Sequence, residues 1–145
     1  MPYHAMSDDE VRAFLTRPPV RPATLATVRK DGTPHVAPVW YAVDDDGSIL
    51  FNTGAETVKG RAIRRTGRVA LCVQDDRPPF SFVTIEGDAA WTDDLAEVRP
   101  WAARIGGRYM GDDRAEEFGA RNGVAGELLI RVTPTRVVAA RDVAE

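Results

Sequence analysis

The segment 48–73 constrains the fold most, because its residue types change in the order expected for a strand, a turn, a short helix and a second strand. Ile49–Phe51 is an apolar run, and Asn52–Gly54 is expected to end it. Thr57 is a good helix N-cap, since its hydroxyl can accept a hydrogen bond from a free amide of the first turn. Gly67 suits a helix end that needs a positive φ, and the apolar run after it predicts a buried strand.

Lys59 is an unexpected charge on the inward side of this predicted helix. With about 100° between successive residues, it falls within the arc formed by Val58, Ala62 and Ile63. The opposite side holds four basic residues, Arg61, Arg64, Arg65 and Arg68. An inward lysine near a helix N-terminus is well placed to bind an anion, because free amides and the helix dipole attract negative charge there. The ordinary alternative is a lysine that runs its stem along apolar surface, and spacing alone does not separate the two.

Length and charge exclude several classes of protein. At 145 residues the chain can bury a core without disulfides, and we expect a single domain over residues 1–145. The net charge of −3 argues against broad binding to nucleic acid or to a membrane surface. One cysteine, Cys72, and two histidines give no zinc-binding spacing, and we expect Cys72 to be a small core residue. No apolar run reaches the length of a membrane span, so a cytoplasmic location is expected by default.

The rest of the chain predicts further strands, joined mostly as hairpins, with helices at the periphery. Strands are expected at residues 23–29, 33–43, 80–91, 127–132 and 137–140, and helices after Ser7 and over residues 94–110 and 112–122. Pro34 and Pro38 belong at a sheet edge because they have no amide to donate, and Glu86-Gly87 suggests a bulge. We therefore predict a mainly β fold with peripheral helices, a small antiparallel barrel of six or seven strands.

The sequence lacks the common catalytic motifs. It has no nucleophile elbow, phosphate-binding P-loop or glycine-rich dinucleotide motif. His35 could act as an acid or base near neutral pH, but no serine or cysteine motif accompanies it. The carboxylates lie in turns and on helix faces, so a paired acid and base is not indicated. We assign no catalytic residue and no metal site, and we expect a bound cofactor to supply the chemistry.

Five stretches of the chain occur in an order similar to that of a known superfamily. They are ATLATVRKDGTPHVAPVWY, ILFNT, TVKGRAIRRTGRVAL, FVTIEGDA and RVTPTRV, and they span most of the chain from Ala23 to Val138. In this order and spacing the sequence resembles the split-barrel flavin and deazaflavin oxidoreductases, the superfamily that includes the pyridoxine-phosphate-oxidase-like proteins. The likeness is greatest to the branch that uses the deazaflavin coenzyme F420.

The resemblance implies a split β-barrel of the FMN-binding type that forms a homodimer, with two cofactor sites at the subunit interface. Lys59 would pair with the cofactor phosphate, helped by Thr53, Thr57 and Arg61. His35 matches a polar position that contacts the cofactor. The ring system would be bordered by the backbone of Ala37, Pro38 and Val39, and by Phe80 of the same chain or of the partner.

The leading hypothesis is an oxidoreductase in which reduced F420 passes a hydride to an unsaturated small molecule. A proton would come from solvent, from His35 or from a tyrosine such as Tyr41, and none of these is singled out. The first alternative is an FMN-dependent enzyme of the same fold, because Lys59 would bind a phosphate in the same way. The second is a carrier that binds a flavin-like molecule without turnover. The family often has asparagine where Ala62 stands, so this helix turn departs from the pattern.

Overall fold

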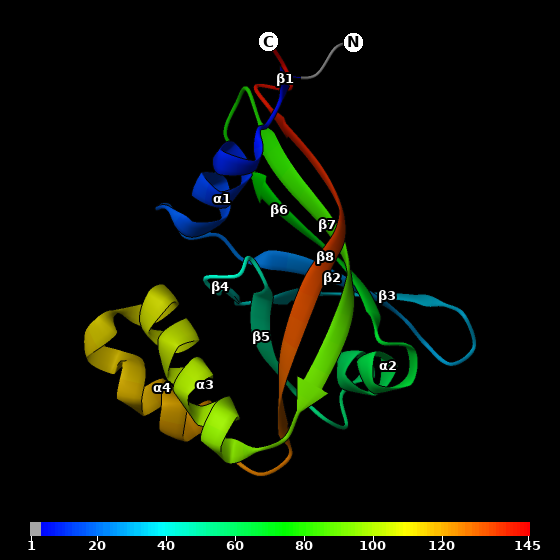
Figure 1. Ribbon diagram of the computed structural model, residues 1–145, viewed down its shortest axis with the longest axis vertical. Helices are drawn as coiled ribbons and strands as arrows, with labels where there is room; N and C mark the ends of the chain where they lie inside the picture. The colour runs from blue at the N-terminus through cyan, green and yellow to red at the C-terminus, as the bar shows by residue number, and fades with distance from the viewer. Residues whose placement is uncertain (1–3) are drawn as a thin grey trace.

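The computed structural model describes residues 4–145, whose strands form one antiparallel sheet that curls into a partly open barrel (Figure 1). The strands are β1 (His4–Ala5), β2 (Ala23–Val28), β3 (Pro34–Val39), β4 (Ala42–Val43), β5 (Ile49–Gly54), β6 (Arg68–Asp75), β7 (Ser81–Thr92) and β8 (Glu127–Arg141). The helices are α1 (Asp8–Thr16), α2 (Val58–Thr66), α3 (Leu95–Met110), the 3-10 helix η1 (Asp112–Arg114) and α4 (Ala115–Asn122). The predicted mainly β fold with peripheral helices is confirmed.

Only two residues join the two ends of the sheet. The strand order is β3-β2-β6-β7-β8-β5-β4, with β1 added beside β8. β3 and β4 therefore lie at opposite ends of the sheet, although only Trp40 and Tyr41 separate them in sequence. Neighbouring strands lie about 4.8 Å apart, so two residues cannot span this sheet if it is flat. The sheet has to curl until its ends approach, and the gap left between β3 and β4 makes it a split barrel.

This closure corrects the strand predicted at residues 33–43. The segment breaks after Val39, because its first part pairs with β2 and its second part pairs with β5. Pro34 and Pro38 both lie in β3, which is an end strand of the sheet. A missing amide is tolerated at such an edge, so the predicted edge position of the two prolines is confirmed.

The two strands predicted on either side of Pro134 form one continuous strand, β8. The register between β7 and β8 shifts at the predicted bulge, because Glu86 faces Arg136 whereas Gly87 faces Pro134. Thr135 is thus the extra residue of the bulge. The pairing is already irregular at Pro134, so the proline does not end the strand.

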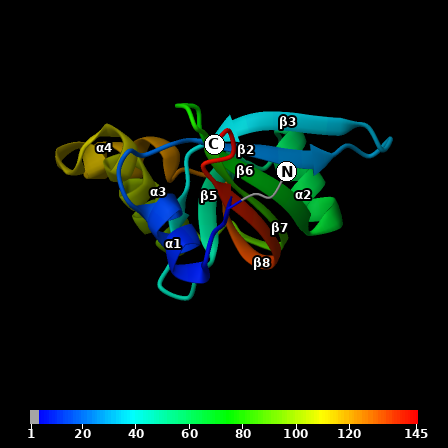
Figure 2. The same cartoon turned by 90° about the horizontal axis from the view of Figure 1, so that it is seen from above.

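The core fills the inner face of the barrel. Its fully buried side chains include Leu25, Tyr41, Phe51, Ile63, Val83, Leu128 and Ile130. α1 and α2 add Leu15 and Ile63 to this core. α3 packs against the other face of β5 and β8 through Val98, Leu50 and Leu129. Figure 2 shows the result: α3 and α4 lie on one side of the barrel and α2 lies on the other.

The outer faces of β2, β3, β6, β7 and the second half of β8 carry mostly small and apolar side chains, together with Thr84 and the ion pair of Glu86 and Arg136. Residues in register on this outer sheet face are Ala26, Val36, Ala70, Cys72 and Val138. Val36 and Val138 are 61% and 45% exposed. The prediction that Cys72 is a core residue is wrong: it is half-buried on the outer sheet face, because its neighbours in β6 point inward. Within residues 4–145, no helix is long and apolar enough to cross a membrane.

Candidate functional site

α2 begins at a tight connection from β5. The hydroxyl of Thr57 accepts a hydrogen bond from the amide of Gly60 at 3.1 Å, and Gly67 ends the helix with a φ of 64°, so both predicted caps are confirmed. β5 continues through Gly54 and does not end at Asn52, because this stretch pairs with β8. A Cβ atom on Gly60 would lie 2.1 Å from the carbonyl oxygen of Gly54. The first turn of α2 therefore touches the end of β5, and this contact fixes where the helix begins.

Lys59 lies beside a hollow of about 350 Å³, which we call the lysine hollow. The hollow is lined by Pro22, Pro38, Val39, Trp40, Asn52, Lys59, Ile105 and Asn122. Among the described residues, no carboxylate forms a direct ion pair with Lys59, which is half-buried. The side chain thus carries a charge without an ion pair to any described residue, and it belongs to the first turn of α2, whose free amides also attract an anion. Val58 was expected to point inward as well, but it is 40% exposed.

One wall of the lysine hollow is aromatic and firmly held. Trp40 stacks on Tyr109 with ring centroids 5.0 Å apart and planes 5° apart, and it meets the edge of Phe118 at 5.8 Å. The hydroxyl of Tyr109 accepts a hydrogen bond from the amide of Tyr41 and donates one to the carbonyl of Arg21. Burial raises the pKa of Tyr109 to about 12, so this hydroxyl stays protonated. The exposed part of Trp40 offers the hollow a flat apolar surface.

Three residues expected to help Lys59 lie outside the lysine hollow. The hydroxyls of Thr53 and Thr57 are 3.1 Å apart, and Thr57 donates to the carbonyl of Gly54 at 2.8 Å. Both hydroxyls therefore serve the start of α2, and Thr53 is only 4% exposed. Arg61 extends toward solvent, where its guanidinium lies 3.2 Å from the carboxylate of Glu56. Their contact with a phosphate remains a prediction.

The predicted residues of β3 divide between the two faces of the strand. His35, Ala37 and Val39 point to the barrel side, whereas Pro38 points outward. Pro38 and Val39, at the end of the strand, both line the lysine hollow. The Nδ1 atom of His35 is buried without a hydrogen-bond partner, and so is Oγ1 of Thr27, the residue opposite it in register. Buried polar atoms normally have partners, so a group that brings one is expected here. Neither His35 nor Thr27 lines the lysine hollow, so the structure does not bring this histidine to Lys59 within the hollow.

Phe80 does not join the site within one chain. It lies in the connection between β6 and β7, with a φ of 68° and 44% exposure. Figure 1 shows this connection at the opposite end of the molecule from α2. Phe80 could therefore border the lysine hollow only from a second copy of the chain.

Tyr41 cannot serve as the proton donor that we considered. Its side chain is 1% exposed, and its hydroxyl donates to the carbonyl of Leu15 at 3.0 Å. Burial raises the pKa of this hydroxyl further, although the guanidinium of Arg108 acts in the opposite direction. The residue is part of the core, and solvent and His35 remain as proton sources.

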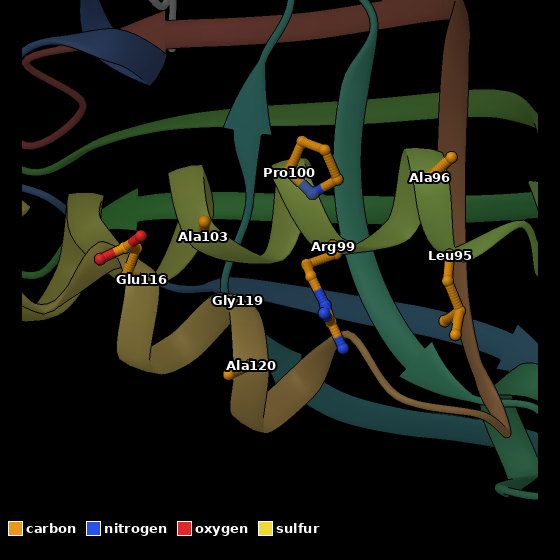
Figure 3. Close-up of a pocket in the computed structure, with 8 residues that line it drawn as sticks. All are labelled: Leu95, Ala96, Arg99, Pro100, Ala103, Glu116, Gly119 and Ala120. Carbon is orange, nitrogen blue, oxygen red and sulfur yellow. The ribbon is translucent and has the colours of Figure 1, made fainter.

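A larger hollow, of about 720 Å³, lies between α3 and α4 (Figure 3). Figure 3 shows Arg99 extending from α3 toward α4, with Glu116 at the far end of the hollow. The guanidinium of Arg99 already donates to the carbonyl of Gly123 at 3.2 and 3.3 Å. The remaining lining is mostly aliphatic, so this hollow offers less chemistry than the lysine hollow despite its size.

Trp40, Asn52 and Asn122 were not predicted from the sequence. Alternation along β5 does place Asn52 on the face opposite Thr53, and this was a usable signal. That Lys59 and Asn52 line the same hollow became apparent only from the packing of α3 against β5. Asn122 stands at the end of a helix, and no pattern in the sequence connects it with Lys59.

Comparison with solved structures supports the fold. A conserved hypothetical protein of Mycobacterium tuberculosis is 26% identical, with a TM-score of 0.83 over 100% of this chain and 92% of that chain. An F420 reductase is 27% identical, with a TM-score of 0.68 over 87% of this chain and 94% of that chain. An FAD-binding protein of Mesorhizobium loti, 20% identical, has a TM-score of 0.69 over 96% and 97% of the two chains, and it shows the fold alone.

The family is shown by a separate comparison. Curated protein sequences give no significant match. The family model described as pyridoxamine 5'-phosphate oxidase matches residues 7–140, a span that contains the whole lysine hollow. The chain therefore belongs to the pyridoxamine 5'-phosphate oxidase family, within the flavin and deazaflavin split-barrel superfamily.

Proposed function

We propose that the protein is an oxidoreductase that uses coenzyme F420 to transfer a hydride to an unsaturated small molecule. The main support is Lys59, a cation without an ion-pair partner that faces a hollow with an aromatic wall. The likeness to an F420 reductase, at 27% identity over 87% of this chain, favours the deazaflavin. The matching family model names an oxidase of pyridoxamine 5'-phosphate, and this keeps an FMN-dependent enzyme as the second candidate.

The residues of this chain would bind and orient the cofactor. Lys59 would donate a charged hydrogen bond to a phosphate oxygen, with the free amides of the first turn of α2 beside it. Trp40 would exclude water from the ring system, and Nδ1 of His35 would gain the partner that it lacks. The bound cofactor supplies the hydride, so the protein itself needs no nucleophile.

We propose further that two copies pair through the outer sheet face to complete two such sites in a homodimer. The outer sheet face exposes Val36 and Val138 beside the ion pair of Glu86 and Arg136, and a largely apolar surface with a few charges is of the kind that marks an interaction site. Pairing would also allow Phe80 of one copy to approach the lysine hollow of the other. Sedimentation velocity would test this, with Val36→Asp as the variant that should yield monomers. If Val36→Asp remains dimeric, the interface does not lie on the outer sheet face.

The choice of cofactor can be tested by binding. We expect purified protein to quench or shift the fluorescence of F420 in a saturable titration and to bind FMN more weakly under the same conditions. Tighter binding of FMN would favour the second candidate. Binding of neither molecule would contradict the proposed function.

Turnover needs a separate test. We expect stopped-flow oxidation of bound reduced F420 to be faster with at least one activated alkene, quinone or nitro compound than in free solution. If every acceptor reacts at the uncatalysed rate, the protein is a cofactor carrier and not an enzyme.

A further inference from the structure

Glu127 is a carboxylate on the face of the sheet that also carries Asn52, one of the residues that line the lysine hollow. It is the first residue of β8 and faces Gly54 in register. A Cβ atom on Gly54 would lie 3.8 Å from Oε1 of Glu127 and 3.2 Å from Cγ2 of Thr57. The carboxylate therefore lies over the end of β5, beside the residue that caps α2.

Among the charged groups around Glu127 that the structure describes, Lys59 is the one that has no ion-pair partner. Burial raises the pKa of its carboxyl, and the ammonium group of Lys59 lowers it by a smaller amount. Glu56, in the turn before α2, is bound by Arg61 and Arg64, so these three charges compensate one another. Within residues 4–145, Glu127 and Lys59 form no direct ion pair. The electrostatic influence of Lys59 on Glu127 therefore acts without a direct contact.

We propose that Glu127 and a phosphate-type anion compete for the charge of Lys59, so that anion binding at the lysine hollow takes up a proton. For the natural ligand this inference rests on the proposed function, in which a cofactor phosphate meets Lys59. The reason is electrostatic: two negative groups that share one cation disfavour each other, and the carboxylate is the one that can take a proton. The proton comes from solvent and remains on Glu127, where the neutral carboxyl can donate a hydrogen bond to the anion.

The consequence is a pH-dependent affinity. Below the pKa that Glu127 has in the free protein, the carboxyl is neutral and the anion meets an unopposed Lys59. Above the pKa that it has in the complex, each binding event places a dianion near a carboxylate. Between these two values affinity falls as pH rises, because binding and protonation are linked.

Inorganic sulfate is the appropriate probe, since it remains a dianion between pH 4 and 7.5, a range that begins below the ordinary pKa of a glutamate, and any pH dependence then belongs to the protein. We would measure its binding to the full chain by calorimetry at constant ionic strength, in two buffers with different ionisation enthalpies. The parent protein should lose about tenfold in affinity across this range, as expected for a dianion within several ångströms of a carboxylate in a water-like dielectric. It should also take up a fraction of a proton per sulfate bound.

Three variants assign the effect. Glu127→Gln should bind sulfate more tightly at pH 7.5 and lose most of the pH dependence, whereas Glu116→Gln on α4 should behave as the parent. His35→Gln should retain the pH dependence, which separates Glu127 from the histidine that was predicted to contact the cofactor. The proposal is overturned by an unchanged profile in Glu127→Gln, by absent proton uptake, or by failure of the parent to bind sulfate at pH 4. Sulfate binding with the expected profile but no binding of F420 or FMN would overturn the proposed function alone.

Discussion

Replacing Lys59 with alanine tests the central contact of the site. The side chain lines the lysine hollow and has no ion-pair partner among the described residues, so its removal should change the free energy of unfolding by less than about 0.5 kcal/mol. A hydrogen bond to a charged group contributes about 1.5–3 kcal/mol, and each 1.4 kcal/mol corresponds to a factor of about ten. Lys59→Ala should therefore weaken cofactor binding by about one to two orders of magnitude, measured by fluorescence titration.

Arg61→Ala is the matched control for this variant. It removes the same charge two residues further along α2, from a side chain that is 63% exposed and paired with Glu56. Arg61→Ala should weaken cofactor binding by about threefold at most, and this loss should decline with added salt, because exposed charges are screened. An equal loss of affinity in both variants would show that cofactor binding depends on the overall charge of α2 and not on a contact made by Lys59. A loss of less than threefold in Lys59→Ala would refute the anion site.

Three further predictions concern the framework of the site. Gly60→Ala should lower the free energy of unfolding by about 1–2 kcal/mol in urea titrations, because its Cβ atom would clash with the backbone of β5 while alanine recovers some helix propensity; an unchanged urea midpoint would contradict it. Tyr109→Phe should cost about 1–3 kcal/mol, since a part-buried amide and a carbonyl lose their partner, and near-ultraviolet circular dichroism should report a loosened Trp40. The guanidinium of Arg77 lowers the pKa of Asp75 from 3.8 to about 2, so the stability that this carboxylate contributes is present above pH 4 and is lost as pH falls toward 2. Asp75→Asn should therefore lower the melting temperature at pH 7 but not at pH 2, with a cost of about 1 kcal/mol or less after solvent screening; an equal decrease at both pH values would contradict the charge pairing.

The features predicted correctly from the sequence depend on neighbouring residues. Thr57 caps α2 and Gly67 ends it. Both could be predicted because a cap hydrogen bond and a positive φ each depend on only a few neighbouring residues. The bulge at Glu86-Gly87 and the edge position of Pro34 follow from the same kind of local chemistry. Amphipathic spacing likewise placed Lys59 on the inward side of its helix.

The errors arose where the structure depends on pairing between distant segments. The predicted strand 33–43 breaks because its two halves pair at opposite ends of the sheet, and no residue within it encodes that division. The predicted interruption at Pro134 is absent, because the bulge accommodates a residue that has no amide to donate. Cys72 lies in an apolar run, but the pleat turns it to the outer face, and alternation alone cannot say which face is buried.

The sequence by itself determined the family resemblance, the start and end of α2 and the choice of Lys59 as the charge to examine. The tertiary structure decided what surrounds that charge. Trp40, Asn52 and Asn122 meet Lys59 only because the sheet curls and α3 packs across β5, and Glu127 approaches only through the register of β8. The physical reason is that a helical phase is fixed over a few residues, whereas the composition of a site depends on which remote elements bury their apolar faces together.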